Sequence, residues 1–511
     1  MKANTRRRGL RALLGRIPGI VIVPVLAFIA LGAWGLSSAP GSSPDDDFHL
    51  SSIWCGLGDR EPLCGPGDDD DEGTVARDVV DASACFRFLP EIGAECQGAD
   101  FSDDPEDTVS THRGNFAGLY PRIFYATMSL FASTDINASV VIMRLVNAAI
   151  FIGLVIAAYL LLPLRRRAPL LAGVVLVAVP LGMFIIPSTN PSSWAFASAA
   201  VLWISTVGYL ETTGARRVWL GVLAAIATLV GAGARGDAAL YAIAGLAIAL
   251  FLGFRRDRGF MLAAILPVAL AIIAAIFYLS TSQSAVTVDG FEGTPPASVS
   301  AWLGLFTSNL ISSPSLWVGA LGSWGLGWLD TPMPGVVWVL GFAVVVATIV
   351  FGLRRPTWRV LCVLGGLVVL LAVLPSYILT QTGVQVGSHV QPRYIMPLII
   401  ILVGVAVYAA AQNTVVSRPL IVLGVVGLAV TNALALLTNT RRYVSGLDVF
   451  HPNLDAHVEW WWTVAPSPLT NAVVGSLAFA LMLVVVATPL WRIARADLET
   501  QAQPLPAEAA R

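Results

Sequence analysis

Charged residues are scarce in this 511-residue chain. Asp, Glu, Lys and Arg make up only 12% of it, and Lys2 is the only lysine among 31 basic residues. Soluble globular domains carry about 25% charged residues. Because 56% of the residues are hydrophobic and the mean hydropathy is +0.74, the composition excludes an ordinary soluble protein and predicts a polytopic membrane protein.

Common nucleotide-binding and hydrolytic motifs are also missing. The chain has no Gly-x-x-x-x-Gly-Lys loop, no Gly-x-Ser-x-Gly elbow and no His-Glu-x-x-His zinc helix. No cytoplasmic segment is predicted to be large enough for a domain that binds a nucleotide sugar. If the protein is a transferase that acts outside the cell, where nucleotide sugars are not supplied, a polyprenyl-phosphate sugar would be its natural donor.

Long apolar runs are what the chain has in abundance. Twelve of them are long enough to cross a hydrocarbon core of about 30 Å. They cover approximately residues 17–36, 138–162, 168–186, 194–210, 218–234, 238–254, 260–279, 334–353, 360–379, 392–411, 419–437 and 472–490. The sequence therefore predicts an all-α protein with about twelve transmembrane helices.

Arginine placement predicts the orientation, because basic residues are retained on the cytoplasmic side. Arginines precede the first run and follow every even-numbered run: Arg6, Arg7, Arg8, Arg11, Arg16, Arg165, Arg166, Arg167, Arg216, Arg217, Arg255, Arg256, Arg258, Arg354, Arg355, Arg359, Arg418, Arg492 and Arg495. This pattern predicts a plasma-membrane protein with both termini in the cytoplasm. A signal peptide is the alternative explanation of the Arg-rich start.

The runs also divide the chain into segments. These are a cytoplasmic N-terminus with the first helix (1–36), an acidic extracytoplasmic loop (37–137), helices two to seven (138–279), a second outer loop (280–333), helices eight to twelve (334–490) with an outer loop at 438–471, and a cytoplasmic tail (491–511). Residues 119–131 suit an interfacial helix. Residues 301–328 suit either a re-entrant helical pair or a hairpin of two further spans.

The first outer loop differs from the rest of the chain in charge and in cysteine content. Residues 40–112 hold 19 of the 32 acidic residues, which excludes nucleic acid as a partner for this face. Four of the five cysteines, Cys55, Cys64, Cys85 and Cys96, lie in this loop and predict two disulfides in an oxidising exterior. Nearest-neighbour pairing is one of three connectivities. A zinc site is the alternative, although the loop contains no Cys-x-x-Cys pair.

An acidic cluster just beyond the first apolar run is the best candidate for chemistry. Pro44 suits the first turn of a helix and Ser43 its cap, which would place Asp45 and His49 on one face. Asp45 or Asp46 would accept a proton from a hydroxyl group, while the neighbouring carboxylate or His49 orients it or helps to hold a divalent cation. The alternative is a solvated loop start. The acidic run at residues 68–72 suits a solvated loop or a weak calcium site.

Seven arginines lie on the outer side close to predicted helix ends, against the orientation rule: Arg113, Arg122, Arg144, Arg235, Arg393, Arg441 and Arg442. Arginine binds phosphate through two N–H groups and keeps its charge. Together these residues would suit a lipid-linked phosphate or diphosphate. For each one alone a structural ion pair is the competing interpretation, and Arg235 with Asp237 is the clearest case.

Polar and aromatic residues in two other outer loops suit sugar binding. Asn190 and Trp194 would contact sugar hydroxyls or stack on a sugar ring, although a capped turn fits the same residues. The tract Trp460–Trp462 suits a carbohydrate platform or an interfacial anchor. His389, His451 and His457 are too scattered to indicate a metal centre.

Taken in order, these elements resemble a bacterial membrane-protein family, domain of unknown function 2142, which looks related to GT-C glycosyltransferases. The matching stretches are Pro44-Asp45-Asp46 with His49, Gly118-Leu119-Tyr120-Pro121 with Tyr125, Met143-Arg144-Leu145, Asn190-Pro191, Gly327-Trp328-Leu329-Asp330-Thr331 with Pro334, Gln391-Pro392-Arg393-Tyr394 with Pro397, and Arg441 with Tyr443 and Gly446. This chain departs from the family in having Asp46 in place of Glu and Pro392 in place of Gly.

The resemblance implies a GT-C-like fold and an inverting glycosyltransferase with a catalytic carboxylate in the first outer loop. The donor would be a polyprenyl-phosphate sugar, the acceptor a cell-envelope glycan or lipid, and the surroundings membrane lipid. Catalytic residues would be Asp45, Asp46 and His49, and substrate-binding residues would be Tyr120, Arg122, Arg144, Asn190, Arg235, Asp330, Arg393, Tyr394, Arg441 and Arg442. A transporter or flippase of lipid-linked saccharides is the alternative function, and a non-catalytic assembly factor is a third.

Overall fold

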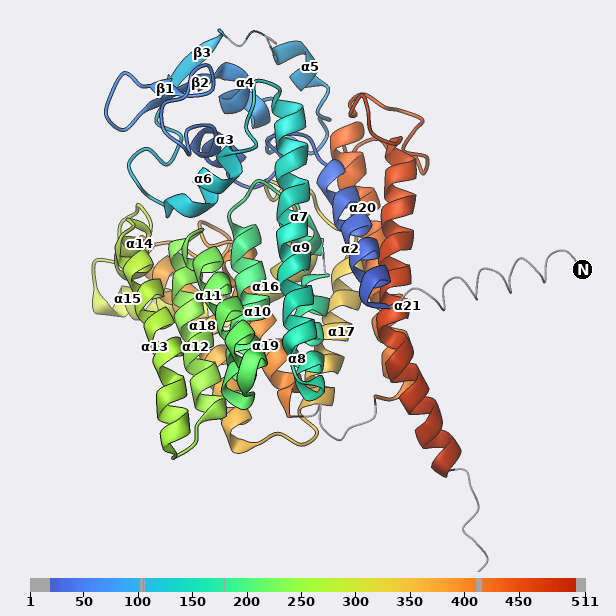
Figure 1. Cartoon of the computed structure of the whole chain (residues 1–511). Helices are drawn as coiled ribbons and strands as arrows, with labels where there is room; N and C mark the ends of the chain where they lie inside the picture. The colour runs from blue at the N-terminus through green and yellow to red at the C-terminus, as the bar shows by residue number, and fades with distance from the viewer. Residues whose placement is uncertain (1–18, 102–103, 105, 179, 410–415, 502–511) are drawn as a thin grey trace, which may run out of the picture.

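The computed structural model describes residues 19–101, 104, 106–178, 180–409 and 416–501. In this part of the chain a bundle of long helices carries a compact cap at one end (Figure 1). The cap lies between α2 and α7 in the sequence. The arginines that precede the first helix and were used to predict a cytoplasmic N-terminus, Arg6 to Arg16, lie outside the described residues.

Ten helices in the described part of the chain are long and apolar enough to cross a membrane. They are α2 (Gly19–Leu36), α7 (Ile136–Leu161), α10 (Ser192–Glu211), α11 (Gly214–Ala232), α12 (Gly236–Gly253), α13 (Arg258–Leu279), α17 (Gly335–Gly352), α18 (Trp358–Thr382), α20 (Arg418–Val444) and α21 (Pro468–Gln501). Each corresponds to one of the predicted runs. The apolar runs therefore identified these helices correctly from hydropathy alone.

The other two predicted runs form shorter helices. Residues 168–186 are divided between α8 (Leu164–Val177) and α9 (Pro180–Ile185). A proline at the start of α9 lacks the N–H group needed to continue the preceding helix. Residues 392–411 contain α19 (Pro392–Tyr408), which has 17 residues. Only ten of the twelve predicted spans therefore meet the length expected of an uninterrupted membrane helix.

The most completely buried long helix is α10, which lies at the centre of the bundle. Its buried positions run without a polar face from Ser192 to Gly208. The helices α11, α12, α19 and α7 pack around it. A helix that is apolar on every side is stable only when protein or lipid surrounds it. Here protein surrounds it, so α10 forms the core that fixes the positions of its neighbours.

The described part of the chain is mostly helical, as predicted, but the cap is not purely helical. It contains α3 (Asp46–Trp54), α4 (Arg77–Val80), α5 (Cys96–Asp100) and α6 (Arg122–Ser129). It also contains a three-stranded antiparallel sheet of β1 (Gly65–Pro66), β2 (Gly73–Ala76) and β3 (Thr108–Thr111). Strands of two to four residues leave too little alternation in the sequence to be recognised.

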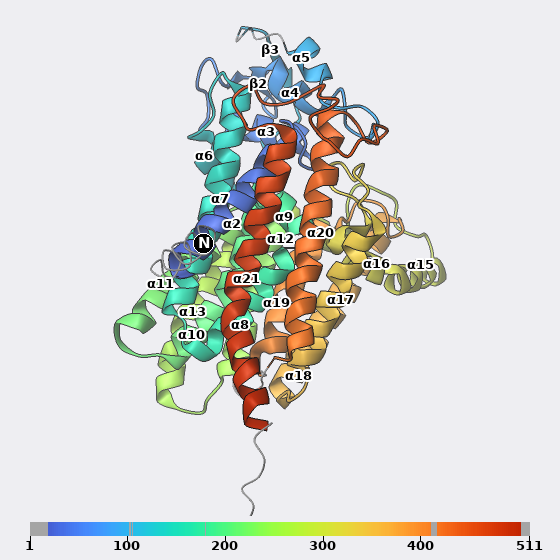
Figure 2. The ribbon, with the colours of Figure 1, turned by 90° about the vertical axis from the view of Figure 1, so that its right-hand side faces the viewer.

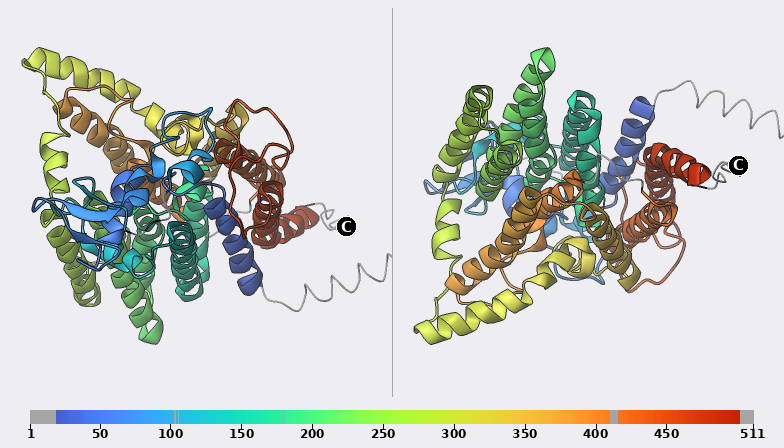
Figure 3. Two further views of the ribbon diagram at one scale, coloured as in Figure 1. Left: turned by 90° about the horizontal axis from the view of Figure 1, so that it is seen from above. Right: turned by 90° about the horizontal axis from the view of Figure 1, so that it is seen from below.

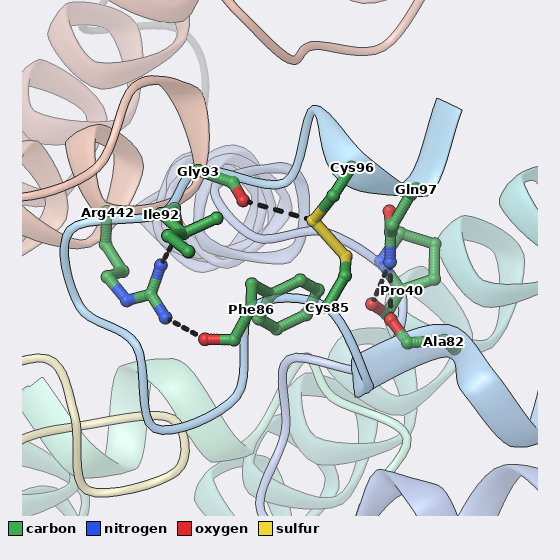
Figure 4. Close-up of a disulfide and its surroundings, with 9 residues drawn as sticks. All are labelled: Pro40, Ala82, Cys85, Phe86, Ile92, Gly93, Cys96, Gln97 and Arg442. Carbon is green, nitrogen blue, oxygen red and sulfur yellow. Dashed lines mark hydrogen bonds between the residues drawn. A yellow bond between two sulfur atoms is a disulfide. The ribbon is translucent and has the colours of Figure 1, made fainter. Parts of the chain in front are cut away.

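Two disulfides hold the cap together, as predicted. Cys55 pairs with Cys64 across a Cα–Cα distance of 5.1 Å, and Cys85 pairs with Cys96 across 6.0 Å. Nearest-neighbour pairing is thus the observed connectivity. Around the second disulfide, Gln97 Nε2 donates to the carbonyl oxygens of Pro40 and Ala82 (2.8 and 2.6 Å), which ties the start of the cap to its interior (Figure 4).

Short helices join α13 to α17 on the capped side of the bundle. They are α14 (Gln283–Asp289), α15 (Val299–Ser312), α16 (Pro314–Val318) and a π-helical turn, Gly319–Ser323. Figures 2 and 3 show α15 lying along the edge of the bundle, across the direction of the long helices. Asn309 Nδ2 attaches it to Thr380 Oγ1 of α18 (3.2 Å). With 14 residues, α15 does not form the hairpin of two spans that was one interpretation of this segment.

The end opposite the cap carries short connections and many of the arginines. Arg166, at the start of α8, forms a bidentate ion pair with Glu211 at the end of α10, and the Arg166 guanidinium stacks on the Tyr408 ring at 3.7 Å. Arg359 donates to the carbonyl oxygens of Leu252 and Phe254. These arginines connect helix ends and leave the capped end as the place to look for a functional site.

Candidate functional site

The acidic cluster lies at the start of α3, under the cap. The predicted helix start at Pro44 was wrong. Asp45 adopts a left-handed conformation with φ of 59°, and α3 begins at Asp46. Aspartate tolerates this conformation better than most residues. The N–H group of His49 still donates to the carbonyl oxygen of Asp45 (2.9 Å), so these two residues are adjacent as predicted.

Asp45 forms an ion pair with an arginine that is 348 positions away in the sequence. Arg393 Nη2, at the start of α19, donates to Asp45 Oδ2 at 2.5 Å. The Arg393 side chain is 1% exposed, whereas that of Asp45 is 33% exposed. Burial opposes the charged form of Asp45, but the surrounding positive groups, Arg393 above all, together outweigh it and lower the pKa of the carboxyl group. Asp45 is therefore an ionised carboxylate that solvent can reach.

Asp46 is in a different environment, although it is the next residue. It is fully buried, and its two oxygens accept hydrogen bonds from Thr189 Oγ1 (2.8 Å) and from the N–H group of Ser43 (2.9 Å). Burial raises the pKa of Asp46 to about 6, despite the positive charge of Arg144 nearby. Asp46 therefore holds the loop before α3 against the turn between α9 and α10, and it does not face solvent.

His49 is also fully buried and has one free nitrogen. Its Nδ1 lies 2.9 Å from the Tyr125 hydroxyl of α6, while its Nε2 has no hydrogen-bond partner among the described residues. Burial lowers the pKa of His49 to about 3, so the ring is neutral at pH 7. The negative charge of Asp45 raises the pKa of His49, and the positive charges of Arg393 and Arg235 lower it further.

Arg235, in the turn between α11 and α12, completes the arrangement. Its Nε and Nη2 donate to the two oxygens of Asp237 (2.8 and 2.9 Å), the structural pair expected from the sequence. Its guanidinium carbon lies 5.6 Å from the Tyr120 ring centre and 4.9 Å from that of Tyr394. Arg393 is also 4.9 Å from the Tyr394 ring, so the two guanidinium groups share one aromatic neighbour.

We call this set the polar cluster: Asp45, His49, Tyr120, Arg235, Asp237, Arg393 and Tyr394. Four buried nitrogens in it lack a hydrogen-bond partner among the described residues, namely His49 Nε2, Arg235 Nη1, Arg393 Nε and Arg393 Nη1. In the other arginines with a buried unpartnered atom in that part of the chain, the buried unpartnered atom is Nε alone: Arg60, Arg418, Arg441 and Arg442.

Unpartnered buried donors are costly, because each loses its hydrogen bonds to water without replacing them. Two guanidinium Nη1 groups that share one aromatic neighbour can form charge-assisted hydrogen bonds with an anion. A phosphate or carboxylate would satisfy them. The polar cluster therefore has the chemistry of an anion-binding site with a solvent-accessible carboxylate at its edge.

Arg144 was predicted to bind the ligand but makes its contacts elsewhere. Its Nη1 donates to the carbonyl oxygens of Gly35 and Ser38 (2.8 and 2.5 Å), and its Nη2 donates to the carbonyl oxygen of Ala39 (2.8 Å) and to Ser42 Oγ (3.0 Å). Four acceptors thus occupy both terminal nitrogens. Arg144 shapes the chain between α2 and the acidic cluster.

Asn190 has a similar supporting position. Its Nδ2 donates to the carbonyl oxygen of Pro44 (2.8 Å) and its Oδ1 accepts from the N–H group of Ser192 (2.9 Å). Both ends of the amide are therefore used within the protein. Trp194 is buried and donates to Asn147 Oδ1 (2.9 Å), so this turn has the capped form and supports the acidic cluster from below the cap.

Asp330 and Arg442 form a second buried ion pair, away from the polar cluster. Arg442 Nη2 donates to Asp330 Oδ2 (2.8 Å) and to the carbonyl oxygen of Phe86 (2.8 Å), while Nη1 donates to that of Ile92 (2.5 Å). Figure 4 shows Arg442 reaching into the loop that the second disulfide closes. The pair connects α20 to the loop before α17, and the carbonyl oxygens of Phe86 and Ile92 connect Arg442 to the cap.

The remaining predicted residues lie near the surface or in loop contacts. Arg122 is exposed at the start of α6 and lines a cleft of about 250 Å³ in the cap. Arg441 Nη2 donates to the carbonyl oxygen of His451 (3.1 Å). Trp462 Nε1 donates to the carbonyl oxygen of Leu36 (2.8 Å), and Trp461 Nε1 to that of Pro466 (2.7 Å). The tryptophan tract therefore anchors its own loop.

Three residues that lie beside the candidate residues were not singled out from the sequence. Tyr125 holds His49, Thr189 holds Asp46, and Asp47 forms ion pairs with Arg87 (3.1 Å) and Arg113 (3.0 Å). Tyr125 was part of the stretch that resembles the family, which was the available signal. Thr189 and Asp47 had none, because their partners lie far away in the sequence.

A divalent cation at the acidic cluster was an open expectation. In the described residues, the side chains arranged closely enough to share an ion are Asp69, Glu72 and His112, at the edge of the cap. Asp45, Asp46 and His49 are not in such a group. His112 Nε2 lies 2.8 Å from Glu72 Oε1, and Ser110 Oγ donates to Glu72, so this acidic loop is held by its own contacts.

The opposite pKa shifts of Asp46 and His49 lead to a test by pH. A carboxyl group with a raised pKa in the folded state contributes stability at low pH that is lost as the pH rises through about 6. A histidine with a lowered pKa contributes stability near neutral pH that is lost as the pH falls below 6.5. When the pH is raised from 4.5 to 7.5, the stability of Asp46→Asn should therefore increase relative to that of wild type. The stability of His49→Gln should decrease relative to that of wild type over the same change of pH.

The measurement is the midpoint of thermal unfolding in detergent at the two pH values, followed by tryptophan fluorescence. Glu91→Gln is the matched control, because Glu91 is an acidic residue of the cap outside the polar cluster. Its midpoint should follow that of wild type at both pH values. Equal pH dependence in wild type, Asp46→Asn and His49→Gln would contradict the burial-driven shifts.

Comparison with known proteins provides a family and no function. No curated protein and no solved structure matches this chain. Residues 28–402, which include the acidic cluster, Arg235 and Arg393, match a family of predicted membrane proteins named DUF2142. The match covers well over half of the sequence, and many apolar helices accompany it. The protein therefore belongs to the DUF2142 family and is a multi-pass membrane protein.

Proposed function

We propose that this protein is a GT-C-like glycosyltransferase that moves a sugar from a polyprenyl-phosphate carrier to a glycan or lipid of the cell envelope. One observation carries the proposal: the ionised, accessible carboxylate of Asp45 pairs with the buried guanidinium of Arg393, which contacts the same Tyr394 ring as Arg235, and both arginines have unpartnered N–H donors. Sugar transfer from a lipid phosphate requires a base for the acceptor hydroxyl and donors for the leaving phosphate.

Each member of the polar cluster then has a separate role. The acceptor oxygen attacks the anomeric carbon, the bond from that carbon to the phosphate oxygen breaks, and the hydroxyl proton goes to Asp45. Arg235 Nη1 and Arg393 Nη1 stabilise the negative charge that develops on the phosphate. Attack opposite the leaving group inverts the sugar configuration. Asp46 and His49 position α3 and do not take the proton.

The proposed topology places the cap outside the cell. Two disulfides in the cap support this orientation, since disulfides persist in oxidising compartments. Arginine-rich connections at the opposite end support a cytoplasmic position for that end. Counting α8 with α9 as one span, and α19 as another, gives twelve spans with both termini in the cytoplasm. A bilayer thins around a short hydrophobic helix at a modest cost.

The test compares three adjacent aspartates in one assay. Purified protein in nanodiscs receives a radiolabelled polyprenyl-phosphate sugar and envelope acceptors, and product is measured for wild type, Asp45→Asn, Asp46→Asn and Asp47→Asn. Asp45→Asn should lower turnover by about 10²–10⁴-fold, the usual value of general base catalysis. Asp46→Asn should reduce it less, and the control Asp47→Asn should stay within a few-fold of wild type. Equal turnover in all four proteins would remove the base assignment.

A lipid-linked-saccharide flippase is the competing proposal. It would use the same arginines only transiently, so it predicts transfer of fluorescent lipid between leaflets of a proteoliposome without any glycosylated product. Charged groups deep in several spans would favour it. The charged residue that the described spans bury at depth on the capped side is Arg144, and four hydrogen bonds hold it in place. Sugar transfer therefore remains the leading proposal.

A further inference from the structure

We propose that a groove between α17 and α20, at the end of the bundle opposite the cap, binds an anionic phospholipid of the surrounding bilayer. The site is separate from the polar cluster and does not depend on the proposed function. Figure 2 shows α20 between α17 and α21 on one face of the bundle, and α20 packs against both helices. The groove has a volume of about 610 Å³, within the size range of sites that bind small ligands.

The wall of the groove is apolar and follows one face of α20. Its lining residues on that helix have the i, i+3, i+4, i+7, i+8 spacing of a single helical face: Pro419, Val422, Leu423, Val426 and Gly427. Leu340 of α17 completes the apolar lining. Val422 and Val426 are 46% and 54% exposed, so the described chain leaves about half of each side chain uncovered. A hydrocarbon chain is the neighbour that such a surface requires inside a membrane.

The groove has the depth of one leaflet. It begins at Arg418, the first residue of α20, and extends to Gly427, nine positions further along the helix. At 1.5 Å per residue this is about 14 Å, close to half of the roughly 30 Å hydrocarbon core. The two helices approach each other at the deep end, because a Cβ atom on Gly427 would lie 3.2 Å from Val344 Cγ2. An acyl chain that enters beside Arg418 therefore ends near the middle of the bilayer.

Arg418 supplies the charge that selects the headgroup. In the described part of the chain it pairs with no carboxylate, and its buried Nε has no hydrogen-bond partner. Its guanidinium carbon lies 5.3 Å from the ring centre of Trp491 in α21, which holds the group beside the groove. The first turn of α20 contains no acidic residue, so the positive end of the helix dipole adds to this charge. A lipid phosphate without a cation of its own would neutralise the site through charge-assisted hydrogen bonds.

Native mass spectrometry of the full-length protein in detergent tests the proposal. The probes are dioleoyl phosphatidylglycerol, which is anionic, and dioleoyl phosphatidylcholine, which is zwitterionic, and the dissociation constant of the first bound lipid is measured for each. Wild type should bind phosphatidylglycerol about fivefold more tightly, the effect of one arginine near a lipid headgroup. Arg418→Gln should remove this preference, and Arg418→Lys should retain most of it. Val422→Trp, which fills the groove, should weaken binding of both lipids.

Arg256→Gln and Val484→Trp are the matched controls. Arg256 is exposed in the turn between α12 and α13 at the same end of the bundle, and Val484 is a 51% exposed residue of α21 outside the groove. Each control should change both dissociation constants by less than about twofold. Equal binding of the two lipids by wild type, or equal effects of Arg418→Gln and Arg256→Gln, would overturn the proposal. Loss of a dimer in Val422→Trp, with lipid binding unchanged, would assign the groove to a second copy of the chain.

Discussion

Replacing Arg393 by alanine is expected to lower the rate of sugar transfer by at least about 10²–10³-fold, the loss typical of removing a preorganised donor to developing negative charge. The substitution removes two unpartnered donors and also the partner of Asp45. Asp45 would become a carboxylate without its arginine, although its 33% exposure leaves it accessible to water. The measurement is initial turnover with a polyprenyl-phosphate sugar.

Arg113→Ala is the matched control for that experiment. Arg113 forms its ion pair with Asp47 and its side chain is 56% exposed, so its loss should change turnover by less than about fivefold. Arg393→Lys separates charge from shape, because lysine keeps the charge but lacks the planar fork. It should recover only a small part of the lost rate. Full activity in Arg393→Ala, with unfolding like that of wild type, would exclude Arg393 from the active site.

Replacing Asp330 by alanine is expected to destabilise the folded protein by about 3–5 kcal/mol, the cost of leaving a buried charge without its partner. Arg442 has no exposed surface and would keep its charge beside the carbonyl oxygens of Phe86 and Ile92. The N–H group of Phe88 would also lose its acceptor, since it donates to Asp330 Oδ2 (3.1 Å). Chemical unfolding in detergent measures the difference.

The ion pair of Arg77 and Asp107 provides the comparison, because it lies in the same cap but is exposed. Its side chains are 48% and 33% exposed, and Asp107→Ala should cost less than about 1 kcal/mol. The double variant Asp330→Leu with Arg442→Met should recover part of the loss, since it removes both buried charges. A cost for Asp330→Ala equal to that of Asp107→Ala would show that the buried pair does not stabilise the junction of α20 with the cap.

Local sequence signals predicted a large part of this structure. Apolar runs identified the long helices because a membrane span needs about 20 apolar residues in succession. Each cysteine pairs with its nearest neighbour in the sequence, 9 or 11 positions away. Closeness along the chain was therefore enough to suggest the observed connectivity. The interruption between α8 and α9 was missed, because a hydropathy value contains no information on the missing backbone N–H group of Pro180.

The site was only partly predictable, because its contacts join distant segments. The sequence indicated that Asp45, Arg235 and Arg393 lie on one side of the membrane, since arginine is expensive there without a partner or function. It did not indicate that Arg144 donates to three backbone carbonyl oxygens and to Ser42 Oγ, or that Arg442 pairs with Asp330. Those assignments depend on which carbonyl oxygens the fold brings within 3 Å. No local pattern contains that information.

The position of a bound phosphate tests the central claim most directly. A cryo-electron microscopy structure of the protein in nanodiscs with farnesyl phosphate would locate it. We expect the phosphate oxygens within about 3 Å of Arg235 Nη1 and Arg393 Nη1, with the Asp45 carboxylate beside them. Phosphate density at the opposite end of the bundle, near Arg166, with the polar cluster closed and unchanged, would contradict the account.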